Sequence, residues 1–406
     1  MKILHTADWH LGKKLDHFSR LEEQRAVLDE ICEIADREQV DAVIVAGDLF
    51  DQINPSVEAI DLLYKSLKKL AKNGHRPVVG IAGNHDSPDR IEAPVPLARE
   101  CGIVLTGYPN SHPTPFSLDS GLSITQADEG FVELKIPGIN FPLRLILTPY
   151  ANEIRLKKFL GTENPETELR TVLQQTWRNL ADKYCDPLGV NILMAHLFLI
   201  NKSGEKPEEP EDEKPILTVG GAQEIFTENL PPQVQYVALG HLHRPQVIEH
   251  TACPVVYSGS PLAYSMSEAG QEKFVFILEA EPQKPISWVK IPLISGKKLH
   301  RKTFDSIQET IHWLQENPNT LVELTFVSDQ FMTAEERKLI MEAHEGIITL
   351  IPRINNPDSL QFQTLDIDLS RDISELFTDY FRYKQGQEPN DRIMNLLKEV
   401  LAEDEE

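Results

Sequence analysis

Two stretches of the sequence, AVIVAGDLFD at residues 42–51 and VVGIAGNHD at residues 78–86, decide the fold. Each begins as an apolar run rich in valine and isoleucine, which is typical of a strand buried on both faces. Each run then reaches a small residue that is followed by Asp, Asn or His. The same pattern occurs in KILHTADWH at residues 2–10, VNILMAH at residues 190–196 and VQYVALGH at residues 234–241. The sequence therefore predicts five strands that end in polar, reactive side chains.

Helical patterns lie between the first three runs. Residues 21–38 and 57–72 carry apolar side chains at the spacing of a helix that buries one face. Alternation of strands and helices predicts an α/β layer fold, in which functional residues collect at the carboxyl ends of the strands. The polar residues that end the five runs therefore stand where a functional site is expected.

The chain changes character after residue 271. Strand-like runs and helical patterns follow without a cluster of metal-type ligands, which predicts a separate α+β domain. From residue 372 onward, two stripes at helical spacing flank the link QGQEPN at residues 385–390 and predict a C-terminal helical pair. The expected domains are residues 1–271, 272–370 and 371–406.

The 406 residues carry a formal net charge of −23 and four cysteines without a CxxC spacing. Such cysteines indicate neither a disulfide framework nor a thiolate zinc site. The apolar start of the chain is too short for a signal peptide and no segment approaches a membrane span, so a cytoplasmic protein without a membrane partner is expected. The negative charge argues against a protein that coats nucleic acid. However, acids concentrate at residues 205–213 and 399–406, whereas cations cluster near the start, at Lys13, Lys14, Arg20 and Arg25. These four cations are candidates for phosphate contact, and a solvated helix face is the alternative for at least half of them.

The strand ends supply seven oxygen and nitrogen donors and no sulfur. Asp8 and His10 are two residues apart, as are His241 and His243, and such pairs on an extended strand point to the same side. This set suits two divalent ions better than one closed structural zinc site, and a carboxylate can bridge two ions. Two ions about 4 Å apart form a clamp that hydrolyses phosphoesters. The seven donors are Asp8, His10, Asp48, Asn84, His196, His241 and His243.

Each member of this set has a simpler explanation when taken alone. A single Gly-Asp or Ala-His at a strand end is more often a turn or a core histidine. Chance does not readily produce the ordered succession DWH, AGD, AGNHD, MAH and GHLH. The set as a whole therefore carries the metal hypothesis.

Five motifs resemble the signatures of the calcineurin-like metallophosphoesterases: Asp8-x-His10, Gly47-Asp48-x-x-Asp51, Gly83-Asn84-His85-Asp86, His196 and Gly240-His241-x-His243. Longer strings, among them LHTADWHLGKKL, VAGDLFDQINPS and YSGSPLAYSMSE, are similar to the SbcD-type nucleases within that family. The resemblance implies an α/β four-layer sandwich of two central sheets flanked by helices. A smaller α+β capping domain and the C-terminal helical pair would follow it.

The resemblance also implies roles for the site residues. One metal ion would be held by Asp8, His10, Asp48 and His243, and the other by Asp48, Asn84, His196 and His241. Manganese is the expected ion at both positions. His85 would protonate the leaving oxygen or steady the transition state, and Asp86 would either orient the His85 ring or cap a turn. Asp51 departs from the archaeal and eukaryotic relatives, which carry histidine at this position.

By the same resemblance, the chain is expected to be a DNA nuclease that uses a water activated by two metal ions. It would degrade duplex ends in the 3′ to 5′ direction and cut single strands or hairpins. The expected partners are DNA, an SbcC-type ATPase with a long coiled coil, and a second copy of the chain. The stripe Ile60–Leu70, with Ile91 to Leu97, is most simply explained as core, whereas the resemblance implies that helices of this region pair two copies. The C-terminal helical pair would bind the ATPase, and the alternative is that it packs onto the chain's own second domain.

Two other classes of function use the same residues differently. A small-molecule phosphodiesterase would act on cyclic nucleotides with the same metals, and a scaffold protein would carry a degenerate site. The complete set of donors disfavours the scaffold. The additional C-terminal segments disfavour the small-molecule enzyme, which has little use for them.

Overall fold

A computed structural model describes residues 1–157, 165–202, 224–249, 251–355 and 372–385, together with residues 389, 393–394 and 397. The chain divides into two compact units, Met1–Phe326 with Glu335–Ile351 and Val327–Ala334 with Pro352–Glu406. The first unit contains two large sheets, and all the candidate site residues lie in it.

The first sheet has six strands in the order β17-β16-β1-β4-β5-β6. Strands β4 and β5 are buried at every residue because the sheet is covered on both faces, and this explains their uninterrupted apolar sequences. The outer face packs against helices α1 (Leu21–Arg37) and α2 (Val57–Leu70). The four parallel strands are β1 (Lys2–Thr6), β4 (Ala42–Ala46), β5 (Val78–Ile81) and β6 (Ile103–Thr106).

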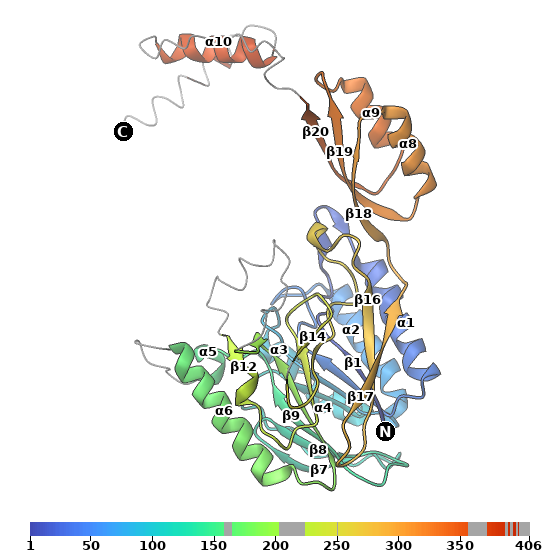
Figure 1. The fold of residues 1–406 in the computed structure, drawn as a ribbon, viewed down its shortest axis with the longest axis vertical. Coiled ribbons are helices and arrows are strands. Elements are labelled where there is room, and N and C mark those ends of the chain that lie inside the picture. The colour runs from blue at the N-terminus through green and yellow to red at the C-terminus, as the bar shows by residue number, and fades with distance from the viewer. Residues whose placement is uncertain are drawn as a thin grey trace. The chain divides into compact units, whose positions relative to one another are not determined.

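Two strands from beyond residue 272 complete this sheet. Strand β16 (Lys273–Glu279) pairs antiparallel with β1, and β17 (Ser287–Leu293) pairs antiparallel with β16 (Figure 1). Phe276 and Leu278 of β16 fill the core between the two large sheets. The domain boundary expected at residue 272 therefore falls inside the first sheet and needs correction. An apolar run alone does not reveal the strand with which it will pair.

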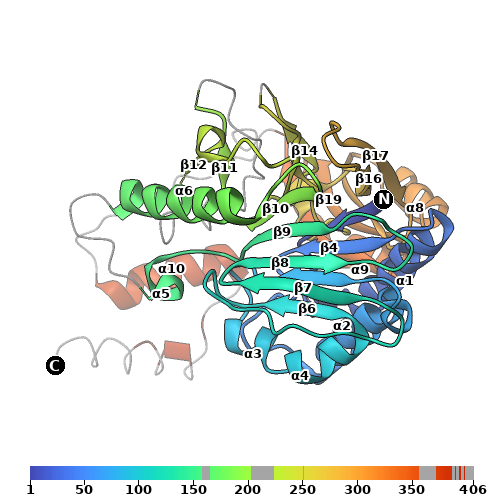
Figure 2. The same ribbon diagram turned by 90° about the horizontal axis from the view of Figure 1, so that it is seen from below.

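The second sheet has seven strands in the order β14-β15-β13-β10-β9-β8-β7. Its parallel centre places His196 at the end of β10 directly beside Gly240 at the end of β13. Helix α6 (Pro165–Tyr184) covers the outer face through Leu169, Leu173 and Trp177 (Figure 2). The strands are β7 (Ser123–Asp128), β8 (Phe131–Lys135), β9 (Leu143–Thr148), β10 (Val190–His196), β13 (Tyr236–Gly240), β14 (Gln246–Ile248) and β15 (Val255–Tyr257).

The two sheets face each other across a shared apolar core. Ile44 and Val79 of the first sheet belong to the same buried cluster as Leu145, Ile192 and Ala238 of the second. Helices, sheet, sheet and helix therefore form four layers, which confirms the predicted α/β sandwich. Short elements at its edges are β2 (Lys14–Leu15), β3 (Phe18–Ser19), α3 (Pro88–Glu92), α4 (Val95–Ala98), α5 (Glu153–Leu156), β11 (Leu199–Ile200) and β12 (Ile225–Phe226).

A small three-stranded sheet follows β17, in the order β18-β19-β20. In the first unit, Leu299 and Leu321 of this sheet share a buried cluster with Leu15 and Met266. An α+β arrangement after the two large sheets is therefore present, but it starts later than expected. The elements are β18 (Lys298–Phe304), α8 (Ile307–Glu316), β19 (Thr320–Ser328), α9 (Ala334–Glu342) and β20 (Ile347–Ile354).

The second unit contains helix α10 (Ile373–Gln385), and the residues of the first of the two predicted C-terminal stripes lie in this helix. The Asp372 carboxylate accepts a hydrogen bond from the Ser374 amide at 2.8 Å and caps the helix start. Most of the second stripe, from Ile393 to Leu401, lies outside the described residues. Across the described part of the chain, every helix is too short or too polar to cross a membrane.

Candidate metal centre

The strand ends that carry the predicted donors adopt an unusual backbone. Asp8, His10, Asp48 and His241 have φ angles of 53°, 44°, 46° and 103°, a region that residues with a side chain seldom occupy. Backbone strain of this kind tends to gather at functional sites, where the surrounding fold holds it in place. These strand ends therefore have the local geometry of a functional site.

Two glycines let the strand ends come close together. A Cβ atom at Gly83 would lie 2.0 Å from Asp48 Oδ1, and one at Gly47 would lie 2.1 Å from His196 Nδ1. Any side chain would clash at either position. The glycines of the AGD and AGNHD motifs are thus required by the approach of neighbouring donors.

Three of the predicted donors form what we call the Asn84 cluster: Asn84, His196 and His241. Asn84 Oδ1 lies 3.0 Å from His196 Nε2 and 3.0 Å from His241 Nδ1. His196 Nδ1 donates a hydrogen bond to the Ala46 carbonyl at 2.9 Å. Because a carbonyl only accepts, this contact requires a proton on Nδ1, so Nε2 is the ring nitrogen that faces Asn84 and could bind an ion.

Three others form the Asp8 cluster: Asp8, His10 and His243. His10 Nε2 and His243 Nε2 lie only 2.9 Å apart. Two imidazole nitrogens that face each other at this distance need a proton or a cation between them. Asp8 is fully buried, and its Oδ2 has no hydrogen-bond partner among the described residues. Buried carboxylate oxygens are rarely left unpaired, so this atom is available to a cation.

Asp48 joins the two clusters. Its Oδ2 atom lies 3.6 Å from His10 Nε2 in one cluster and 3.2 Å from His196 Nε2 in the other. Its Oδ1 atom is occupied by the His85 backbone amide at 2.9 Å. One carboxylate oxygen therefore faces both groups of donors.

The donor set fits two divalent cations. Asp8, His10 and His243 present ligand atoms that all lie within 4.8 Å of one another, and so do Asp8, Asp48 and His196. Burial raises the pKa of Asp8 to about 7, although His196 and His243 act in the opposite direction. Against the effect of its own burial, the charges of Asp48 and Asp8 raise the pKa of His196 to about 9. Both shifts indicate buried negative charge that a cation would compensate.

His85 lies beside the Asp8 cluster, and His10, Asp51 and His85 also present ligand atoms within 4.8 Å of one another. The ring centre of His85 is 4.8 Å from that of His10, with the two rings nearly perpendicular. Its Nδ1 donates to the Asp51 carbonyl at 2.9 Å, which leaves Nε2 as the nitrogen that can exchange a proton.

Asp86 does not orient the His85 ring, so that part of the expectation is corrected. Its carboxylate accepts hydrogen bonds from the amides of Leu49 at 3.0 Å, Phe50 at 2.8 Å and Gly83 at 2.8 Å. Asp86 is fully buried and ties the turn after β4 to the turn after β5. The alternative interpretation of Asp86 as a turn cap agrees with these contacts.

Asp51 and the four cations near the start of the chain differ in what their side chains contact. Asp51 Oδ1 lies 3.0 Å from Lys13 Nζ and 3.6 Å from His10 Nδ1, so it supports the Asp8 cluster from behind. Arg20 is fully buried and pairs with Glu23 at 2.6 Å, which removes it from the candidates for phosphate contact. Arg25 lies 3.9 Å from Glu22 on α1, whereas Lys14 is exposed.

The residues that hold His243 were not predicted from the sequence. Glu268 Oε1 lies 3.6 Å from His243 Nδ1 and accepts a hydrogen bond from the Tyr264 amide at 2.9 Å. Lys273 Nζ pairs with the Glu268 carboxylate and donates to the His243 carbonyl at 2.9 Å. Against the effect of burial, Lys273 and His243 hold the pKa of Glu268 well below its ordinary value. The Ser265-x-x-Glu268 spacing of a capping box was the available signal.

A second missed residue is Arg155 of α5. Its guanidinium donates hydrogen bonds to the carbonyls of Gly83, Asn84 and Asp86 at 2.7, 3.2 and 2.8 Å. No local spacing in the sequence connects Arg155 with the motif it contacts.

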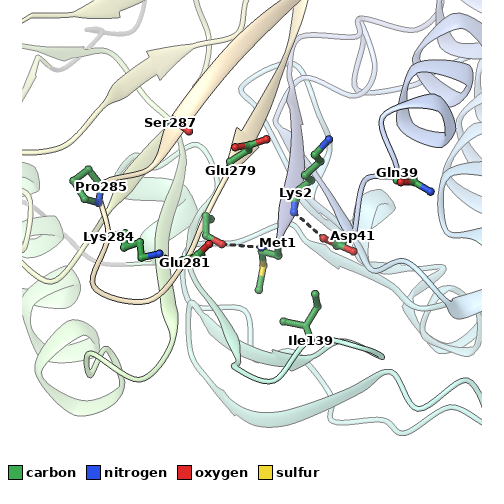
Figure 3. Close-up of a pocket in the computed structure, with 11 residues that line it drawn as sticks. Met1, Lys2, Gln39, Asp41, Ile139, Glu279, Glu281, Lys284, Pro285 and Ser287 are labelled. Carbon is green, nitrogen blue, oxygen red and sulfur yellow. Dashed lines mark hydrogen bonds and ion pairs between the residues drawn. The ribbon is translucent and has the colours of Figure 1, made fainter.

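A cavity of about 470 Å³ lies elsewhere, at the amino end of β1 (Figure 3). Lys2, Asp41 and Glu279 are among its lining residues, and none of the nine candidate site residues lines it. The Lys2 amide donates to Asp41 Oδ2 at 2.7 Å within it. This cavity is therefore separate from the strand ends that carry the candidate metal ligands.

Comparison with known proteins identifies the relatives of this chain. A family model of calcineurin-like phosphoesterases matches residues 1–245. The SbcD subunit of the nuclease SbcCD from Bacillus subtilis is 36% identical over 416 aligned positions, which cover 100% of this chain and 99% of that protein. The corresponding SbcCD nuclease subunit of Rhodobacter capsulatus is 38% identical over 304 positions, or 72% of each chain.

Solved structures give a weaker likeness. A dimetal phosphatase from Danio rerio aligns with 73% of this chain and 97% of its own, at 12% identity and a TM-score of 0.39. At this level the likeness carries no functional conclusion.

Proposed function

The chain belongs to the calcineurin-like phosphoesterases and, within them, to the SbcD family of SbcCD nuclease subunits, and from this premise we propose that it is a metal-dependent nuclease subunit that hydrolyses DNA phosphodiesters. One observation carries the proposal for the site. The Asp8 and Asn84 clusters both face a single oxygen of Asp48, at 3.6 Å from His10 and 3.2 Å from His196. This is the arrangement that a shared carboxylate between two ions requires.

We assign one ion to Asp8, His10, Asp48 and His243, and the other to Asp48, Asn84, His196 and His241. The ligand types, imidazole nitrogens with carboxylate and amide oxygens, suit moderately hard divalent ions, and manganese is the proposed one. When bound, such ions would supply an activated water and neutralise negative charge on the phosphate. The chain contributes the fixed positions of the donors, because backbone contacts hold His196 and Asp48 before any ion arrives.

His85 is proposed as the proton donor to the leaving oxygen. The Asp51 carbonyl holds its Nδ1 proton, so Nε2 is the position from which a proton can be delivered. The ring stands next to His10, at the border of the Asp8 cluster. A donor placed in this way would assist departure of a sugar alkoxide, which is a poor leaving group.

The proposed substrates are DNA ends, single strands and hairpins, with 3′ to 5′ removal of nucleotides from duplex ends and a role in DNA repair and recombination in the cytoplasm. The full-length match to a nuclease subunit supports DNA over a cyclic nucleotide, since that match includes the segments beyond the phosphoesterase region.

Two protein partners are proposed as well. Ile373 and Tyr380 of helix α10 are exposed. They would form part of an apolar surface that an SbcC-type ATPase covers. A second copy of the chain is proposed to pair across α2 and α4, where Val57 and Leu97 are each 78% exposed. Together these contacts would give a homodimer within a heterotetramer.

The test uses the purified chain with manganese on three substrates: a DNA hairpin, a blunt duplex and a cyclic nucleotide. We expect cleavage of DNA, with nucleotides lost from 3′ ends, and no turnover of the cyclic nucleotide. Turnover of the cyclic nucleotide alone would favour the small-molecule phosphodiesterase. Inactivity on all three substrates, also with the ATPase present, would contradict the proposed nuclease.

A further inference from the structure

The backbone of the loop Gly83–Asp86, which carries Asn84 and His85, is held by hydrogen bonds to both its amides and its carbonyls. On one side its amides point at carboxylates: the Gly83 amide donates to Asp86 Oδ2 at 2.8 Å, and the His85 amide donates to Asp48 Oδ1 at 2.9 Å. On the other side its carbonyls face Arg155, which binds those of Gly83, Asn84 and Asp86. One guanidinium thus satisfies three carbonyls within four consecutive residues.

Arg155 is itself held before it reaches the loop. The Asn152 side chain caps α5 by accepting a hydrogen bond from the Arg155 amide at 2.8 Å. The guanidinium lies over the Tyr150 ring, 5.1 Å from its centre, and the Tyr150 amide donates to the Ala82 carbonyl at 2.9 Å. The three hydrogen bonds of the Arg155 guanidinium all go to carbonyls of the loop. Its specific contacts are therefore directed at the loop.

These contacts matter for one side of the metal centre. Asn84 is a neutral ligand, so its contribution to ion binding depends on where its side-chain oxygen is placed rather than on charge. That oxygen stands 3.0 Å from nitrogens of both His196 and His241. Without the guanidinium, three carbonyls would need other donors and the loop could rotate away from this position.

We propose that Arg155 is a positioning residue that holds the Asn84–His85 loop in its ion-binding geometry and thereby sets the affinity of the Asn84 cluster for its ion. The inference rests on the proposed two-ion function. The competing role for a cation near the site is direct contact with the substrate phosphate. If that were the role of Arg155, replacing it would leave ion binding intact. The contacts do not favour that role, because three of the five guanidinium N–H donors already serve the loop.

The test compares Arg155→Met, Arg155→Lys and the matched control Lys157→Met in the full chain. Lys157 is the next cation along the same segment, and it lies over the Tyr108 ring rather than against the loop. Manganese is titrated by calorimetry, and the spin coupling between neighbouring ions is followed by electron paramagnetic resonance. Thermal unfolding of the metal-free proteins checks the fold.

For the wild type and Lys157→Met we expect two bound ions and a spin-coupled spectrum. In Arg155→Met one ion should bind about 10–100-fold more weakly, the usual effect of losing a group that orients a ligand, and the coupled signal should give way to that of an isolated ion. Arg155→Lys should lie between the two. The metal-free proteins should all unfold cooperatively, and Arg155→Met should unfold at a temperature lowered by a few degrees at most, because three hydrogen bonds to the loop are lost.

Three outcomes would overturn the inference. Two ions bound at wild-type affinity, with only KM for DNA raised, would make Arg155 a phosphate contact. Equal weakening of both ions together with a lower unfolding temperature would make it a structural residue. A wild-type chain that binds fewer than two ions would instead refute the proposed function, and the inference with it.

Discussion

The two halves of the proposed metal centre are built from similar candidate ligands but are supported in different ways. Behind the Asp8 cluster stand charged side chains: Glu268 faces His243 at 3.6 Å, and Asp51 faces His10 at 3.6 Å. Behind the Asn84 cluster stand the Ala46 carbonyl, bound to His196, and Arg155, bound to the loop carbonyls. The first half is therefore sensitive to buried charge, and the second to backbone geometry.

The difference follows from where the supporting segments come from. Glu268 belongs to the segment that connects β15 with β16, and it is buried together with Lys273. A buried carboxylate this close to an imidazole favours positive charge at the ring, whether from a proton or from an ion bound to its other nitrogen. Ala46 instead is the last residue of β4, and Arg155 lies in α5, which follows β9. Both therefore act through hydrogen bonds with backbone carbonyls at strand ends.

The largest effect should come from the residue that both halves share. Asp48→Ala should abolish both high-affinity ions, because each half loses a ligand. Losing this charge stabilisation, worth several kcal/mol, should lower turnover of DNA by more than about 10³-fold. Metal analysis and single-turnover cleavage measure the two effects.

The matched control is Asp41→Ala, which removes an aspartate that accepts a hydrogen bond from the Lys2 amide at the opposite end of β1. It should retain two ions. If Asp48→Ala kept both ions, the shared-carboxylate assignment would be wrong.

A smaller loss of activity is expected from His85→Ala, because the His85 ring is assigned to neither set of ligands. The variant should keep two ions and bind DNA, while turnover falls by about 10²–10⁴-fold, the contribution of a positioned proton donor. A phosphodiester with an activated aryl leaving group needs less protonation, so its cleavage should suffer less than that of DNA. Equal defects on both substrates, or loss of an ion, would contradict the proton-donor role.

Charge removal behind the Asp8 cluster should weaken one ion only. Glu268→Gln alone would leave Lys273 buried without its partner, at a cost of about 3–5 kcal/mol, so the double variant Glu268→Gln/Lys273→Met is the informative protein. We expect it to fold and to bind the Asp8-cluster ion about 10–100-fold more weakly, with the Asn84-cluster ion unchanged.

The chain offers a matched control for this pair. Glu133 and Arg144 form another buried ion pair, with a separation of 2.7 Å, in the second sheet. Glu133→Gln/Arg144→Met should leave both ion affinities at the wild-type level. Weakening of both ions in the Glu268 double variant would show that the two halves are not supported independently.

The smallest effect on the metal centre should come from the C-terminal segment. Deleting residues 372–406 should leave manganese-dependent cleavage of single strands within about twofold of wild type, but abolish association with the ATPase. Co-purification of the ATPase with the truncated chain would refute the partner-binding role of α10.

Much of the candidate site could be predicted from the sequence because its candidate ligands follow local patterns. Buried strands that end in AGD, AGNHD, MAH and GHLH meet at one edge of an α/β fold, and the structure places all seven donors within the two clusters and Asp48. What the pattern could not predict was the direction of individual side chains. Asp86 turns toward the backbone amides of Leu49 and Phe50, and Arg20 turns inward to Glu23.

The supporting residues were beyond the reach of local patterns for a different reason. Arg155 lies 71 residues from Asn84 in the chain, and Lys273 lies 30 residues from His243. Their contacts arise only when β9 and β16 take their places in the two sheets. The domain boundary at residue 272 was misplaced for the same reason: β16 pairs with β1, which is far away in the sequence.

The central claim is that two ions share Asp48, one in each cluster. Anomalous diffraction from crystals of the full chain grown with manganese, recorded at the manganese absorption edge, tests it most directly. The account predicts two peaks about 4 Å apart, one against His10 and His243 and one against Asn84, His196 and His241, with Asp48 Oδ2 in contact with both. A single peak, or two peaks that do not share Asp48, would contradict it.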